Sequence, residues 1–197
     1  IHPATEGEVI FEGQNILKLE GEALRQNRRK IQMVFQDPTA AFNPKMRVKD
    51  ILCEPLLNFG LLKNSEVDAK AAELLQMVEL PVEFKDRFPH SMSGGQRQRL
   101  TIARALVGSP CIVILDDAAS ALDFATDAHL RAALRKLSAT TTSIIISQRV
   151  AAVMQADKIL VLDHGKQVGL GTHKELLATC PLYKEICLSQ LRPEEVE

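Results

Sequence analysis

From Ser91 to Gln96 the sequence reads Ser-Met-Ser-Gly-Gly-Gln, and from Ile112 to Asp117 it reads Ile-Val-Ile-Leu-Asp-Asp. The first stretch predicts a helix that is capped by Ser93 and opens on two glycines, so that its first backbone N–H groups can meet a phosphate. The second stretch predicts a buried strand that ends in two carboxylates, and carboxylate oxygens suit a nucleotide-bound Mg²⁺. Together the two stretches indicate an α/β protein that handles a nucleotide phosphate.

Length and composition favour one domain with a substantial core, because the chain has 197 residues, of which 46% are hydrophobic and 25% charged. A net charge of −1 creates no field that would attract nucleic acid, so no nucleic-acid partner is expected. The four cysteines are scattered and are typical of reduced thiols rather than metal ligands. No apolar run approaches the roughly 20 residues of a membrane-spanning helix, so we expect any membrane association to come through a partner.

Segments with strand and helix patterns alternate along the chain. Apolar strands are expected at 31–36, 112–115, 143–147 and 158–162, with a hairpin at 8–15 and a tight hairpin turn at 163–166. Helices are expected at 94–107, 124–137, 149–155, 173–178 and 182–191. This alternation predicts an α/β layered fold with a mostly parallel sheet.

A helical block interrupts the alternation. Pro44 can start one helix, whose apolar face is expected over 48–57. A second helix is expected from Ser65 to about Leu80, where Pro81 ends it. Because strands flank the block, we interpret residues of about 38–92 as an inserted helical subdomain. Ordinary crossover helices are the alternative.

Four motifs, taken in order, resemble those of the ATP-binding-cassette family of ABC transporters. They are Gln36 after an apolar strand, Ser93-Gly94-Gly95-Gln96 at the start of a helix, Asp116 after an apolar strand, and Ser120-Ala121-Leu122-Asp123. The resemblance covers nearly the whole chain. It implies a P-loop NTPase-like fold and an ATP-binding subunit that couples ATP binding and hydrolysis to transport. It also implies a second cassette and transmembrane subunits as partners, which would hold this chain peripherally at the cytoplasmic face of the cell membrane.

The resemblance also implies roles for particular residues. ATP of the partner cassette would meet Ser93, Gly94, Gly95 and Gln96, with Asp123 across the dimer interface. Asp116 would hold Mg²⁺, Gln36 would touch the metal or the attacking water, and Asp117 and Gln148 would complete the catalytic set. The family usually has Glu at the position of Asp117 and His at that of Gln148, and these two departures predict weak hydrolysis.

The phosphate loop is missing, because no G-x-x-x-x-G-K-[ST] motif occurs in the sequence. We therefore expect residues 1–197 to be a single, partial cassette that lacks its N-terminal strands and phosphate loop. The alternative is a non-hydrolytic interaction module that only supplies its signature motif to the ATP site of a partner. ATP hydrolysis by this chain alone is expected to be weak or absent.

The character of the sequence changes near residues 106–110. Up to Leu106 the chain resembles the cassettes of oligopeptide importers, whereas Leu115–Asp123 and Gly165–Leu177 resemble multidrug-type exporters. Our hypothesis is a hybrid chain joined near 106–110 by recombination, engineering or misassembly. Because the two parts imply opposite directions of transport, the cargo and its direction stay open.

Overall fold

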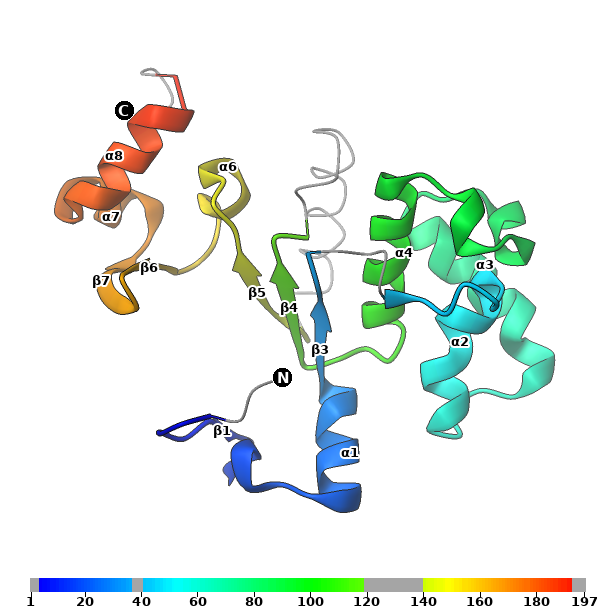
Figure 1. The fold of residues 1–197 in the computed structure, drawn as a ribbon. Coiled ribbons are helices and arrows are strands. Elements are labelled where there is room, and N and C mark those ends of the chain that lie inside the picture. The colour runs from blue at the N-terminus through cyan, green and yellow to red at the C-terminus, as the bar shows by residue number, and fades with distance from the viewer. Residues whose placement is uncertain (1–3, 37–40, 119–139, 193–197) are drawn as a thin grey trace. The chain divides into compact units, whose positions relative to one another are not determined.

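The computed structural model describes residues 4–36, 41–118 and 140–192. Figure 1 shows an α/β fold whose colour runs from blue at the N-terminus to red at the C-terminus. The chain forms two compact units, Ile1–Ile144 and Ile145–Glu197.

The central sheet has the strand order β3-β4-β5, from β3 (Ile31–Val34), β4 (Ile112–Asp116) and β5 (Thr142–Ile146). Strands β3 and β4 are parallel, and the register places Val34 opposite Leu115. Both of these side chains are buried. The predicted α/β class and its parallel strands are therefore confirmed.

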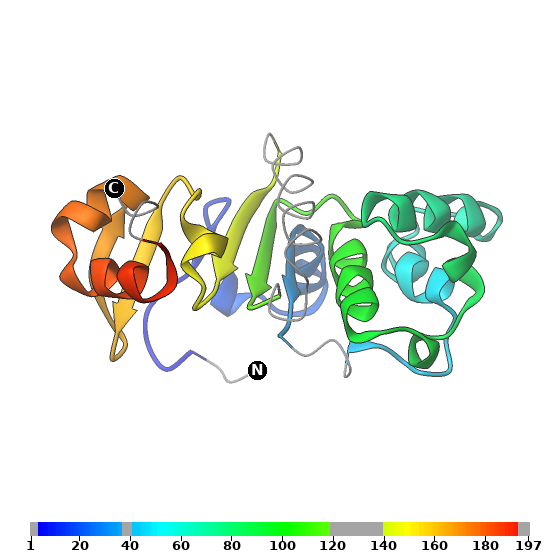
Figure 2. The same cartoon turned by 90° about the horizontal axis from the view of Figure 1, so that it is seen from above.

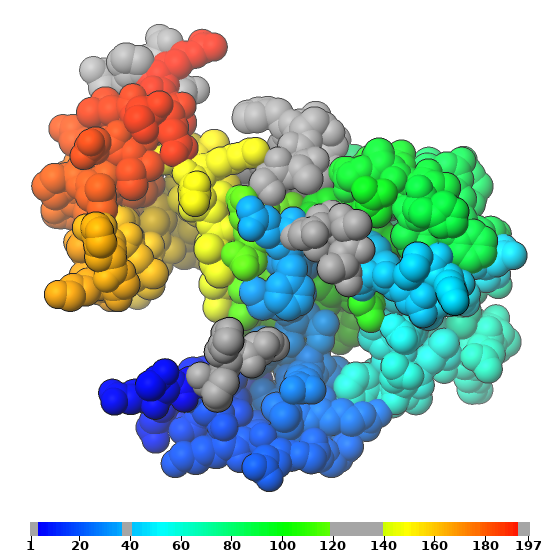
Figure 3. Space-filling model, in the orientation of Figure 1, coloured from blue at the N-terminus to red at the C-terminus, as the bar shows by residue number. Residues whose placement is uncertain are grey.

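The N-terminal segment forms the expected hairpin and then a helix. The hairpin joins β1 (Ile10–Phe11) to β2 (Gln14–Asn15), and a short 3₁₀ turn, η1 (Ile16–Lys18), leads on to α1 (Gly21–Lys30). Figure 3 shows the hairpin and α1 as a blue surface. Helix α1 buries none of its residues. It is held instead by Arg25, which donates to the Asn58 carbonyl at 2.6 Å and lies 4.5 Å from the centre of the Phe59 ring.

A layer of helices follows β3 in the sequence. Its helices are α2 (Val48–Asn58), α3 (Val67–Met77) and α4 (Gly94–Leu106), joined by the 3₁₀ turns η3 (Asn64–Glu66), η4 (Val82–Asp86) and η5 (Pro89–Ser91). Helices α2, α3 and α4 contact one another. Their fully buried large side chains include Ile51, Leu52, Leu74, Leu75, Leu100 and Ile102. A common apolar core therefore holds this layer together.

The expected apolar face at 48–57 lies in α2, but the helix begins at Val48 and not at Pro44, so the predicted start was wrong. Asn43 explains the difference, because its side-chain Oδ1 accepts from the backbone N of Lys45 at 3.0 Å. Its carbonyl also accepts from the backbone N of Met46 at 3.1 Å. These two bonds close a turn around Pro44 and postpone the helix.

The second unit is built from α6 (Val150–Val153), β6 (Ile159–Asp163), β7 (Lys166–Gly171), α7 (His173–Thr179) and α8 (Pro181–Gln190). Strands β6 and β7 are antiparallel, with Asp163 opposite Lys166. His164 and Gly165 between them have φ of 46° and 76°. Two successive positive φ values are typical of a type I′ hairpin turn, so the turn predicted at 163–166 is confirmed.

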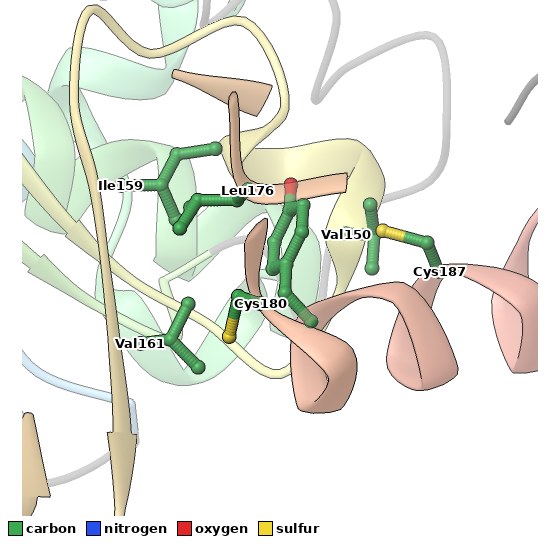
Figure 4. Packing of buried hydrophobic residues seen from close by; sticks show 7 residues of the cluster. Val150, Ile159, Val161, Leu176, Cys180 and Cys187 are labelled. Carbon is green, nitrogen blue, oxygen red and sulfur yellow. The ribbon is translucent and has the colours of Figure 1, made fainter. Parts of the chain in front are cut away.

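Helix α7 packs against β7, and α8 packs against α7, as the orange and red segments in Figure 2 show. Figure 4 shows their common core from close by. The buried side chains of this core are Val150, Ile159, Val161, Leu176, Cys180, Tyr183 and Cys187. The short helix α6 and the long helix α8 are thus joined through apolar contacts.

Across the residues that the structure describes, no helix is both long enough and apolar enough to cross a membrane.

Candidate functional site

Gln36 and Asp117 meet at one end of the central sheet. Each residue lies two positions beyond a pair that the parallel register aligns, Val34 on β3 and Leu115 on β4. The Gln36 Nε2 atom lies 3.4 Å from the Asp117 Oδ2 atom, in a long hydrogen bond. Ligands of open α/β sheets bind at the carboxyl ends of parallel strands, which is where these two side chains lie.

The two carboxylates differ in their backbone conformation. Asp116 is the last residue of β4 and is half-buried, whereas Asp117 follows the strand with a φ of 44°. Aspartate is one of the few residues with a side chain that visits this left-handed region readily. The chain therefore leaves the strand in a sharp bend at the carboxylate pair.

The chemistry of these side chains fits a nucleotide-bound Mg²⁺. Asp116, Asp117 and Gln36 offer carboxylate and amide oxygens, which are the hard ligands that this ion prefers. Within the described ranges, no group of three or more His, Cys, Asp or Glu residues could hold a metal ion. Mg²⁺ bound to a nucleotide takes one or two protein carboxylates and completes its shell with phosphate oxygens and water.

The start of α4 forms the capped helix that the sequence predicts. Ser93 is the N-cap, and its Oγ accepts from the backbone N of Gln96 at 3.3 Å. The Gln96 Oε1 in turn accepts from the backbone N of Ser93 at 2.9 Å. This capping box occupies the N–H groups of Ser93 and Gln96, while those of Gly94 and Gly95 belong to the first turn, where a helix offers no carbonyl acceptor.

The backbone at Gly94 is also open to a close approach. Gly94 is exposed, and a Cβ atom added there would meet no other atom within 4 Å. An anion could therefore approach the first turn of α4 without steric hindrance from neighbouring residues. The helix dipole would favour its negative charge at this end.

Three arginines of α4 make structural contacts. Arg104 pairs with Glu54 at 2.9 Å. Arg97 donates to the Met92 carbonyl at 2.6 Å. Arg99 donates to the Glu79 carbonyl, two residues beyond the end of α3, at 3.0 Å. The bond of Arg97 was not predicted. It ties the helix to the residue immediately before its cap, so that the cap is fixed from both sides.

Gln148 belongs to the second unit and is exposed. Its main-chain carbonyl accepts from Gln190 Nε2 at 2.8 Å, and Val150 N donates to Gln190 Oε1 at 2.9 Å. The contact of Gln190 was not predicted, because a glutamine near the end of an amphipathic helix carries no signal of such a contact. Nothing local in the sequence could have found it.

The predicted site residues thus fall into separate groups. Gln36 and Asp117 are brought into contact next to Asp116, while Ser93, Gly94, Gly95 and Gln96 together open α4. Gln148 lies in the other compact unit. Asp123 lies outside the described residues, as does the helix expected at 124–137.

Two relatives show how much of the chain is shared with known proteins. The chain is 42% identical over 176 residues to the dipeptide transport ATP-binding protein DppF of Lactococcus lactis subsp. cremoris, covering 87% of this chain and 56% of the relative. It is 42% identical over 174 residues to the oligopeptide transport ATP-binding protein OppF of Streptococcus mutans, covering 86% and 56%. The chain therefore spans just over half the length of these two curated relatives.

Solved structures share its fold. The dimeric, post-hydrolysis state of the ATP-binding cassette MJ0796, bound to ADP and Pi, has a TM-score of 0.78 at 30% identity, over 86% of this chain and 74% of that one. A bacterial Atm1-family ABC exporter with ATP bound has a TM-score of 0.76 at 30% identity, over 95% of this chain and 33% of that one. The family model described as ABC transporter matches residues 1–120. Because that match covers more than half of the chain, the chain belongs to the ABC transporter family.

Proposed function

We propose that this chain is the ATP-binding part of an ABC transporter that moves peptides across a membrane. The observation that carries the proposal is the contact between Gln36 and Asp117 at the carboxyl ends of neighbouring parallel strands. The names of the relatives, a dipeptide and an oligopeptide transport ATP-binding protein, support the peptide cargo. The alternative of a non-hydrolytic module is less favoured, because these relatives are named for ATP binding in transport.

The cofactor of the proposed reaction is Mg²⁺-bound ATP. Bound Mg²⁺ would neutralise phosphate charge and orient the phosphates. Asp116 and the amide oxygen of Gln36 are the ligands we assign to it. Asp117 accepts a hydrogen bond from the attacking water and orients it. Because Asp is one methylene shorter than the usual Glu, hydrolysis is slow.

The capped start of α4 serves a nucleotide held by a second cassette. Ser93 offers its hydroxyl, and Gly94 and Gly95 offer their N–H groups, to a phosphate across the dimer interface. The dimeric arrangement of the related cassette MJ0796 supports this assignment. Transmembrane subunits hold this chain at the cytoplasmic face of the membrane and complete the transporter.

Nucleotide-dependent association tests the proposal. The full chain is mixed with a cassette that carries the G-x-x-x-x-G-K-[ST] loop, and association is measured by sedimentation with ATP, with ADP and without nucleotide. We expect ATP and Mg²⁺ to tighten association, and Ser93→Gly to weaken this ATP-dependent association by about tenfold, since it removes the hydroxyl but costs little helix stability.

Ser91→Ala is the matched control, because Ser91 is an exposed serine two residues before the cap. Its Oγ donates to the Phe88 carbonyl at 2.8 Å, outside the first turn of α4. This variant should associate like the unaltered chain. The proposed function would be contradicted if association did not depend on ATP, or if Ser93→Gly left the ATP-dependent association unchanged.

A further inference from the structure

The side-chain amide of Gln190 bonds to the main chain on both sides of Arg149. Its Nε2 donates to the Gln148 carbonyl at 2.8 Å, and its Oε1 accepts from the Val150 N–H at 2.9 Å. Arg149 is extended, with φ of −92° and ψ of 118°. The side-chain amide of Gln190 thus donates to Gln148 and accepts from Val150, two residues further along an extended segment. A residue of a neighbouring β-strand would form the same pair of hydrogen bonds with its main chain.

The packing of α8 in the core of the second unit determines the position of Gln190. Gln190 is the last residue of α8 and lies three residues beyond Cys187, which is fully buried. Figure 4 shows Cys187 close to Val150, and both belong to the core of the second unit. The core that holds α8 in place therefore brings the side-chain amide of Gln190 to the main chain at Gln148.

A further bond limits the freedom of this segment. The Ser147 Oγ accepts from the backbone N of Arg149 at 3.1 Å. Main-chain groups of three consecutive residues, from Gln148 to Val150, are therefore engaged. The backbone is held, while residue Gln148 as a whole is exposed.

We propose that Gln190 is a positioning residue for Gln148. By holding the Gln148 carbonyl and the Val150 N–H, it fixes the direction in which the Gln148 side chain leaves the backbone. A neutral amide can recognise a phosphate only through directed hydrogen bonds, so its orientation matters more than that of a charged group. This inference rests on the proposed function and on the family resemblance, which implies that the side chain at position 148 contacts the terminal phosphate of ATP.

Hydrogen exchange of the full chain tests the contact itself. Gln190→Met is close in size and removes both bonds, and we expect the Val150 amide to exchange at least about tenfold faster, as seen by NMR. Gln190→Glu keeps an acceptor for the Val150 N–H and should restore its protection. Ser189→Ala, at the neighbouring exposed residue, is the control. Equal exchange of Val150 in the Gln190→Met and unaltered chains would overturn the proposal.

The preference for ATP over ADP tests whether Gln190 positions the Gln148 side chain for the terminal phosphate. The ratio of ATP to ADP affinity is measured for the full chain mixed with a cassette that carries a phosphate loop. We expect Gln190→Met to lower this ratio about tenfold when Gln148 is present, and less than about twofold in a Gln148→Ala background. Unfolding midpoints measured in both backgrounds separate this coupling from a general loss of stability.

The outcomes distinguish the two proposals. An equal loss of ATP preference in both backgrounds would show a merely structural role for Gln190 and overturn this inference, while the proposed function would stand. A mixture that binds no nucleotide would overturn the proposed function, and this inference with it. Gln148→Ala without effect on ATP preference would leave the contact intact but refute the positioning role.

Discussion

Asp117 shows how a single residue can combine a conformational role with a chemical one. Its φ of 44° places it in the left-handed region, directly after the last residue of β4. The family usually has Glu at this position, and the sequence alone suggested only a change of side-chain length. The structure adds that the site itself favours a residue tolerant of positive φ.

The conformation of Asp117 gives a prediction about stability. Asp117→Asn should leave the free energy of unfolding within about 0.5 kcal/mol, because Asn also tolerates positive φ. Asp117→Val should lower it by roughly 1–2 kcal/mol, the penalty of a left-handed backbone for a branched residue. Urea denaturation measures both values. Equal stability of the two variants would contradict the expected penalty for a branched residue at this positive φ.

The thiol of Cys53 should make the stability of the folded chain depend on pH. This thiol is fully buried in the helical layer, and burial raises its pKa from 9.0 to about 11. Because the pKa in the folded state lies above the ordinary value, the stabilisation is complete below pH 9 and is lost as the pH rises through 11. The loss should be on the order of 2 kcal/mol.

Cys53→Ala isolates this contribution. Urea midpoints of the variant and the unaltered chain are compared from pH 7 to pH 11 under reducing conditions. The unaltered chain should lose stability more steeply than the variant above pH 9. A difference between the two chains that stays constant with pH would refute the assignment to this thiol.

At the scale of elements, the capping box of α4 has a measurable energy. Ser93→Ala removes the acceptor for the Gln96 N–H and should cost about 1 kcal/mol of unfolding free energy, whereas Ser93→Gly should cost only a few tenths. Chemical denaturation compares the two variants. A cost of Ser93→Gly as large as that of Ser93→Ala would mean that the hydroxyl has no special role in capping.

The packing of β7 against α7 gives a second prediction at this scale. A Cβ atom at Gly169 would lie 2.9 Å from Leu176 Cδ2, closer than real Cβ contacts allow, and 3.0 Å from Cys180 Sγ, which is tighter than most. Gly169→Ala should therefore destabilise the second unit by roughly 1–3 kcal/mol. Gly108→Ala is the control, because no atom lies within 4 Å of its Cβ position. Similar thermal midpoints of the two variants would contradict this account.

At the scale of the whole molecule, the proposed weak hydrolysis can be tested by restoring the residues usual in the family. Asp117→Glu together with Gln148→His should raise ATP turnover when a segment with a G-x-x-x-x-G-K-[ST] loop is joined ahead of Ile1. Steady-state phosphate release measures the rate, with Asp117→Asn as a variant that should stay slow. An unchanged rate in the double variant would refute our explanation of the two departures.

The hybrid origin also stays a proposal at this scale. The suggested join near 106–110 falls between the end of α4 at Leu106 and the start of β4 at Ile112. The matches to the dipeptide and oligopeptide transport proteins, over 176 and 174 residues, extend beyond this loop. One uninterrupted DNA read across codons 106–112 would favour a natural gene over an artificial join.

The sequence by itself determined the features that depend on neighbouring residues. Ser93 and Gln96 lie three positions apart and predict the cap, and the turn of His164 and Gly165 follows from their tolerance of positive φ. The apolar runs at β3 and β4 predict buried parallel strands. The order of the motifs was sufficient to suggest the family that the comparisons then showed.

Only the tertiary structure decided which distant residues meet. Gln36 contacts Asp117 across 81 positions, and Gln190 contacts Gln148 across 42. Such contacts follow from strand register and from a shared core, which depend on how well whole apolar faces fit together rather than on any local pattern. The positive φ of Asp117 and the fixed backbone at Gln148 therefore became visible only once the elements had packed.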